Sequence, residues 1–143
     1  MIKAILFISG LGLALIALAA PISIVGAAAK PTPSGRSYCQ AMTVAGLTSD
    51  GQACITITDT DSANKVAVET MLFLTNDSSQ KANVTTTLSV NNVTQPGSIT
   101  ASYNPLISTR SGWKTSAIAS PGLDTITANF SYNNQTIGSV SGQ

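Results

Sequence analysis

The sequence predicts a hydrophobic N-terminal α-helix followed by an all-β antiparallel sandwich. Three observations lead to this fold class: an uncharged apolar run at residues 4–29, a break rich in Pro and Gly at residues 31–35, and short runs of alternating apolar and polar residues in the rest of the chain. The predicted domains are a hydrophobic helix at 1–29, a linker at 30–36 and a β-sandwich head at 37–143.

The apolar run has no charged residue between Lys3 and Lys30. As a continuous helix, its about 26 residues would extend roughly 39 Å, which is enough to cross a bilayer. Small residues recur along this predicted helix, and they would let neighbouring helices approach closely. These packing residues are Gly10, Gly12, Ala14 and Ala17.

A cleaved secretory signal is the alternative interpretation of residues 1–29. Ala27, Ala28 and Ala29 before Lys30 have the small-residue pattern of a cleavage site, and Pro21 could end a shorter apolar region. The length of the run favours a retained helix that spans the membrane or packs against its own copies. Pro31, Pro33 and Gly35 then predict a hinge between this helix and the head.

The remainder of the chain is rich in Ser, Thr, Val and Ile and is divided by Gly, Pro, Asn and Asp. Asp50-Gly51 and Asn133-Asn134 are predicted turns. Residues 71–74 are apolar on both faces, which predicts a central strand or one covered by a neighbour. The single tryptophan, Trp113, is predicted to lie in the core. The expected strands are 37–45, 53–59, 65–75, 82–90, 98–104, 113–119, 123–132 and 135–141.

Cys39 and Cys54 are the only cysteines, and we predict that they form a structural disulfide. Closing a loop of about 15 residues would stabilise the fold by roughly 3 kcal/mol in the chain-entropy model. A metal site would need more ligands, and a redox pair more often has the spacing C-x-x-C.

Five Asn-x-Ser/Thr sequons occur in the predicted head, so we expect N-linked glycans as partners on at least some of them. Alternation in the predicted strands places Asn83 and Asn129 on an outward face, and two others fall at strand ends or turns. The candidate acceptors are Asn76, Asn83, Asn92, Asn129 and Asn134.

Composition argues against catalysis and nucleic-acid binding. Only 9% of residues are charged, the net charge is +1, and there is no His and one Glu, Glu69. General acid–base chemistry therefore lacks its usual groups, and nothing attracts a polyanion. Oxygen-bearing side chains at 59–64 are predicted to form a polar turn, because they lack the Gly and distal Glu of an EF-hand. We expect no catalytic residues, no metal and no cofactor.

The whole arrangement resembles archaeal type IV pilins, in particular adhesion pilins of thermoacidophilic archaea. Carrying the likeness are the uncharged N-terminal run, the break at 31–35 and a Thr/Ser/Asn-rich β-domain with sequons. The segment 121–139 also resembles the last hairpin of immunoglobulin-like domains, so the predicted sandwich is immunoglobulin-like. Ile5 stands where bacterial type IV pilins have Glu, a residue that archaeal members often lack.

The resemblance implies a structural subunit of an extracellular, cell-surface pilus filament that serves adhesion or surface motility. It implies a homopolymer, inserted in the membrane before assembly, with residues 1–29 in the core and glycosylated heads outside. Two alternatives stay open. One is a secreted fibre subunit with a cleaved signal that donates residues 30–43 as a strand to its neighbour. The other is a membrane-anchored cell-surface binding domain.

Overall fold

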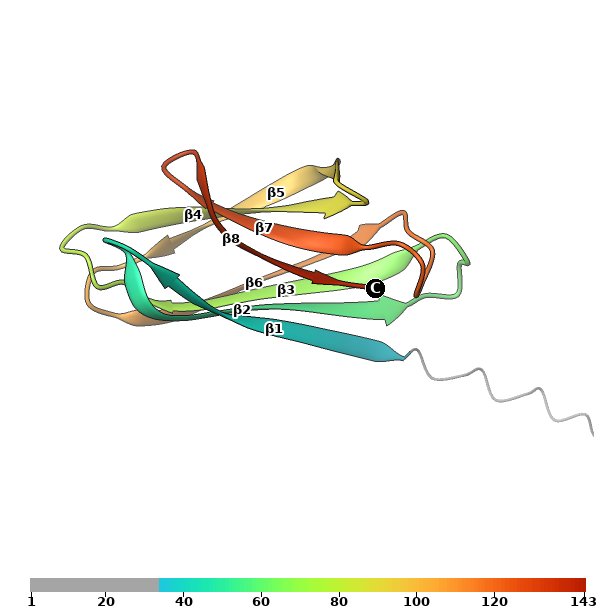
Figure 1. Ribbon diagram of the computed structural model, residues 1–143, viewed down its shortest axis with the longest axis horizontal. Coiled ribbons are helices and arrows are strands. Elements are labelled where there is room, and N and C mark those ends of the chain that lie inside the picture. Colours follow the sequence, from blue (N-terminus) through green and yellow to red (C-terminus); the bar gives the residue numbers. More distant parts are fainter. Residues whose placement is uncertain (1–33) are drawn as a thin grey trace, which may run out of the picture. The chain divides into compact units, whose positions relative to one another are not determined.

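The computed structural model describes residues 34–143, which fold into two four-stranded antiparallel sheets that form two layers (Figure 1). The period-2 alternation of apolar and polar residues explains this, because it gives each strand one face toward the core and one toward solvent. The strands are β1 (Gly35–Val44), β2 (Thr48–Asp59), β3 (Val66–Thr75), β4 (Ala82–Val90), β5 (Val93–Tyr103), β6 (Ser108–Ala117), β7 (Ile126–Tyr132) and β8 (Gln135–Gly142).

The predicted fold class, a helix followed by a sandwich, is wrong for the part of the chain that the structure describes. Residues 34–143 are all-β, without a helix. The helix predicted at 1–29 lies outside the described residues, together with Gly10, Gly12, Ala14 and Ala17. Within residues 34–143, no helix of a length and apolarity suited to crossing a membrane is found.

The strand order is β1-β2-β3-β6 in one sheet and β5-β4-β7-β8 in the other. The chain crosses between sheets three times, from β3 to β4, from β5 to β6 and from β6 to β7. As a result β6 pairs with β3 and β7 pairs with β4. β3 is therefore an inner strand of its sheet, in agreement with the apolar residues on both of its faces.

The core lies between the two sheets and consists mainly of the inward-facing side chains of their strands. Tyr103, one of its largest side chains, is fully buried, and its hydroxyl donates to the carbonyl of Leu72 at 3.3 Å and pairs with the hydroxyl of Ser111. Burial raises the pKa of Tyr103, so this phenol stays neutral. Other fully buried members are Leu47, Ile55, Ile57, Leu72, Leu74, Leu88, Ile126 and Phe130.

Three strands, β2, β5 and β6, begin five residues earlier than predicted. Strand β2 includes Asp50 and Gly51, which are therefore not a turn. A Cβ at Gly51 would lie 3.1 Å from the carbonyl oxygen of Met42, so glycine is needed here for close pairing with β1 rather than for a reversal. β5 begins at Val93 and contains Pro96, which is tolerated because β5 lies at a sheet edge.

Asparagine pairs form the two tightest hairpins. Asn133 and Asn134 have φ angles of 50° and 62°, which confirms the predicted turn between β7 and β8. Asn91 and Asn92, with φ angles of 49° and 68°, make the same kind of turn between β4 and β5. Asn tolerates this left-handed conformation better than other non-glycine residues, and the twist of such a turn matches the strands that it joins.

Candidate functional site

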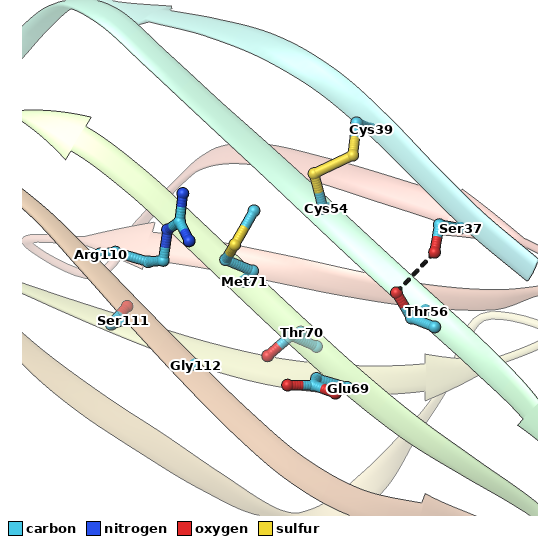
Figure 2. A pocket seen from close by; sticks show the side chains of 10 residues that line it. All are labelled: Ser37, Cys39, Cys54, Thr56, Glu69, Thr70, Met71, Arg110, Ser111 and Gly112. Atoms are coloured by element: carbon cyan, nitrogen blue, oxygen red, sulfur yellow. Dashed lines mark hydrogen bonds between the residues drawn. A yellow bond between two sulfur atoms is a disulfide. The ribbon is translucent and has the colours of Figure 1, made fainter. Parts of the chain in front are cut away.

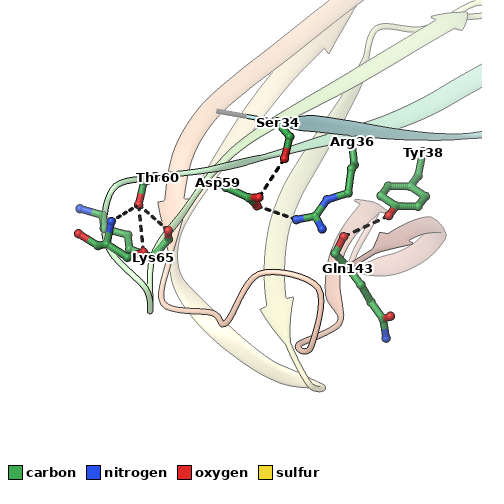
Figure 3. A network of polar contacts seen from close by, with 8 residues as sticks. Ser34, Arg36, Tyr38, Asp59, Thr60, Lys65 and Gln143 are labelled. Atoms are coloured by element: carbon green, nitrogen blue, oxygen red, sulfur yellow. Dashed lines mark hydrogen bonds and ion pairs between the residues drawn. The ribbon is translucent and has the colours of Figure 1, made fainter. Parts of the chain in front are cut away.

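The chain enters the sandwich through β1, and a set of polar contacts fixes this entry strand (Figure 3). The guanidinium of Arg36 donates to Asp59 Oδ1 at 2.7 Å, and the hydroxyl of Ser34 donates to Asp59 Oδ2 at 3.0 Å. Tyr38 donates from its hydroxyl to the carbonyl of Gln143 at 3.1 Å. Residues 34–38 are thus held both to the adjacent strand and to the end of β8.

A disulfide joins Cys39 and Cys54, the pair predicted from the sequence. These residues are directly opposite in the β1–β2 ladder, with their Cα atoms 4.1 Å apart. Together with the polar contacts, the disulfide ties β1 to the sheet at its fifth residue.

The predicted linker and hinge need correction at their C-terminal end. Gly35 and Arg36 belong to β1, so Gly35 is part of the sheet and not of a hinge. Gly35 pairs with Thr58 in the ladder. The other two predicted hinge residues, Pro31 and Pro33, lie outside the described residues.

The outer face of the β1-β2-β3-β6 sheet carries the disulfide and a mixture of charged and apolar side chains. Across β3 and β6, the outward-facing pairs in register are Glu69 with Lys114, Met71 with Gly112, and Phe73 with Arg110. Lys114 Nζ lies 3.6 Å from Glu69 Oε2, in an exposed ion pair.

A shallow depression of about 490 Å³ lies on this face (Figure 2). Gly112 has no side chain, and the neighbouring side chains of Met71 and Arg110 and the disulfide border the space that this leaves. A Cβ on Gly112 would have the carbonyl oxygen of Thr70, at 3.5 Å, as its nearest neighbour. The depression is therefore open toward solvent and is not filled from within the fold.

The outer face of the β5-β4-β7-β8 sheet has a different chemistry. The outward-facing positions of β4 and β7 and their ladder partners on β5 and β8 are all Ser, Thr or Asn. Hydroxyls bridge neighbouring strands at 2.8 Å, as in Thr85 with Thr100 and Thr127 with Ser141. This face is thus polar without being charged, and we call it the hydroxyl face.

Four of the five predicted glycan acceptors belong to the sheet with the hydroxyl face. Asn83 and Asn129 point outward from β4 and β7, while Asn92 and Asn134 occupy the exposed hairpin turns. A depression of about 510 Å³ is lined by Asn83 and Asn134, among other residues. Asn129 is half-buried and donates to the hydroxyl of Ser89 at 3.3 Å.

Asn76, the fifth predicted acceptor, is a structural residue in the folded chain. It is completely buried, and its Nδ2 donates to the carbonyls of Gln80 and Tyr103 at 2.8 and 2.9 Å. Its Oδ1 accepts from the amide and hydroxyl of Ser78. Glycosylation would replace a hydrogen that is needed inside the fold, so Asn76 does not belong with the exposed acceptors.

Local bonding also explains the acidic loop residues. Two donors from Ser49, its amide and its hydroxyl, reach Asp77 Oδ2 at 2.6 Å and lower the pKa of that carboxyl. The amide of Ser120 and the side chain of Asn91 lower the pKa of Asp124 in the same way. In the segment 59–64, Asp59 faces Arg36 rather than the other oxygens of the predicted polar turn.

No family model matches the chain, and no curated protein matches it. A crystal structure of a candidate beta-galactosidase from Bacteroides fragilis aligns with 62% of this chain at 18% identity and a TM-score of 0.43. The alignment spans 15% of that protein.

Proposed function

We propose that this chain is a structural subunit of an extracellular surface filament of the archaeal type IV pilus kind. In this proposal the apolar segment 4–29 lies in the filament interior and the sandwich lies outside. The subunit is not an enzyme, and its partners are its own copies and the glycans that it carries. Before assembly the apolar segment resides in the membrane.

The observation that carries this proposal is the fixed entry strand. In a filament whose subunits are held by their N-terminal segments, tension reaches the head through residues 34–39. An edge strand pulled from its end would unzip one hydrogen bond at a time. The Cys39–Cys54 disulfide stops such peeling at the fifth residue of β1, and the Arg36–Asp59 ion pair resists it before that point.

The distribution of polar groups also supports an exposed head. A face of hydroxyls and amides with four sequons can carry glycans, which would keep a neutral surface soluble. Since this face has no carboxylates or amines in its ladder, its charge would not change with pH.

The decisive experiment is electron microscopy and mass spectrometry of material sheared from cells that make this chain. We expect filaments that contain the chain with the apolar residues 4–29 retained. Sheared fractions without such filaments would overturn the proposal. A control strain that lacks the chain should yield no filament of this kind.

The alternatives give different results in the same experiment. A donor-strand subunit would start near Lys30, and residues 35–44 would have to leave their own sheet, where a disulfide now ties them to β2. A membrane-anchored binding domain would retain the apolar segment but give no filaments.

A further inference from the structure

The two outer faces of the sandwich differ in whether they could carry glycans. All sequon asparagines other than Asn76 belong to the β5-β4-β7-β8 sheet or its hairpins, and three of these four are exposed. The opposite face, on β1-β2-β3-β6, has no sequon among its outward positions and exposes charged and apolar groups instead. It is therefore the face on which a protein partner could pack without meeting a glycan.

In the three central outward rows of β3 and β6, the two residues are complementary to each other. Glu69 is opposite Lys114, the long side chain of Met71 is opposite the bare Gly112, and Phe73 is opposite Arg110. Each of these three rows thus pairs an acid with a base, a projection with a hollow, or an aromatic ring with a guanidinium. The two outer rows, Ala67 with Ser116 and Thr75 with Ser108, have small side chains.

This pattern is what a two-fold symmetric contact requires. If a second copy packs face to face about an axis that runs parallel to the strands between β3 and β6, each residue of β3 meets its own ladder partner on the other copy's β6. Glu69 would then meet Lys114, Met71 would enter the space above Gly112, and Phe73 would meet Arg110, each contact occurring twice.

We propose that the outer face of β3 and β6 is a self-association surface whose occupant is a second copy of this chain. A two-stranded contact lies at the small end of the range for specific interfaces, so the dimer is weak and reversible. This inference concerns the sandwich alone and does not depend on the proposed filament.

A mixing experiment with Glu69→Lys and Lys114→Glu tests the proposal. In a dimer of Glu69→Lys chains, lysines would face lysines, and in a dimer of Lys114→Glu chains, carboxylates would face carboxylates. When the two variants are mixed, opposite charges face each other again in the heterodimer. A purely intramolecular role of the Glu69–Lys114 pair could not be restored by mixing.

Sedimentation of the full chain in mild detergent, at low salt, measures the outcome. We expect each variant alone to dimerise roughly tenfold more weakly than the wild type, and the equimolar mixture to recover wild-type affinity. The matched control is Thr127→Lys with Ser141→Glu, which alters a cross-strand pair on the hydroxyl face, leaves every sequon intact and should not change dimerisation. Unaffected single variants, or a mixture that does not recover, would overturn the proposal.

Gly112→Leu provides a second test that does not involve charge. The added side chain would point into solvent, because its Cβ meets no atom closer than 3.5 Å, so we expect normal folding. It would fill the space that Met71 of the other copy needs, and dimerisation should be lost. A Gly112→Leu chain that melts like the wild type and still dimerises would contradict the proposal.

Discussion

Cys39 and Cys54 face each other directly across β1 and β2, with a Cα–Cα distance of 4.1 Å. The pair connects the strand through which the chain enters to an inner strand of the same sheet. Because the ladder already holds the two residues in register, the covalent bond adds a restraint exactly where hydrogen bonds alone would yield to a pull along the chain.

Replacing both cysteines measures how much the disulfide contributes to the free energy of unfolding. We expect the Cys39→Ser and Cys54→Ser double variant to lose about 3 kcal/mol of unfolding free energy, since its unfolded chain is no longer closed into a loop. For a domain of this size the melting temperature should fall by roughly 10–20 °C, measured by circular dichroism. Reduced wild-type protein should melt like the variant. A fall of less than about 1 kcal/mol would show that the ladder alone holds β1.

Asn76 offers a test that separates a structural amide from a glycan acceptor. Asn76→Ala removes two hydrogen bonds, one to the carbonyl of buried Tyr103 and one to the carbonyl of Gln80, and we expect a loss of about 2–4 kcal/mol in urea denaturation. Ser78→Ala also destroys the sequon but keeps both of those bonds, so its loss should be clearly smaller. Equal losses in the two variants would argue against a structural role specific to the asparagine.

The effect of replacing a hairpin asparagine should depend on whether the new residue tolerates a positive φ angle, not on whether it can form hydrogen bonds. Asn134→Gln places an unsuited residue at a φ of 62°, and we expect a loss of about 1 kcal/mol in thermal unfolding. Asn134→Gly accepts this conformation and should be nearly neutral, although it also removes the sequon. If both variants are equally destabilised, the turn does not depend on the left-handed conformation.

Glycan occupancy should follow exposure. We expect intact-mass measurements on the native protein to find glycans at Asn92 and Asn134, in the exposed turns, and none at Asn76. The variants Asn92→Gly and Asn134→Gly should each lower the mass by one glycan without altering the fold. A glycan on Asn76 would be incompatible with the buried amide described above.

Stability should decrease in acid because of Asp77 and Asp124. Hydrogen bonds hold the pKa of both carboxyls below 3.8 in the folded chain. In the pH range between the lowered pKa of the folded chain and the ordinary value of 3.8, the unfolded chain therefore binds more protons than the folded one. The free energy of unfolding therefore rises with pH through this range. The stabilisation that these two carboxylates contribute is lost as the pH falls through their pKa in the folded chain. Thermal melts should show Asp77→Asn less stable than the wild type at pH 6, and the difference should shrink as the pH falls below 3.8. A constant difference across that range would contradict the assignment.

Strand positions could be predicted well because one face of each strand is buried. Alternation placed Asn83 and Asn129 outward, where the ladders have them. The apolar residues on both faces of 71–74 predicted a central strand or one covered by a neighbour, and β3 is an inner strand. Such a pattern depends only on neighbouring residues in the chain. The predictions failed where a residue's conformation depends on its contacts with another strand. Gly51 was predicted to lie in a turn, but it lies in β2, where its lack of a side chain allows the close approach of Met42 on β1.

Site residues were harder to predict, since burial of a polar side chain leaves little trace in the local sequence. Asn76 looks like any sequon, and only its contacts with Tyr103 and Gln80 reveal its role. Asn91-Asn92 could have been recognised as a turn from the same dipeptide as Asn133-Asn134. Glu69, Met71 and Phe73 are complementary to residues of β6 that lie 37 to 45 positions further along the chain, and no local pattern reveals that register.

The hydrogen bond from Tyr38 to the carbonyl of Gln143 has a practical consequence for labelling. A peptide that follows residue 143 would emerge beside the entry strand, at the end of the sandwich where β1 begins. The β7–β8 hairpin lies at the other end of those strands, with Asn133 and Asn134 exposed at its tip. A fluorophore coupled to a side chain at that tip would lie away from the entry strand and its polar contacts.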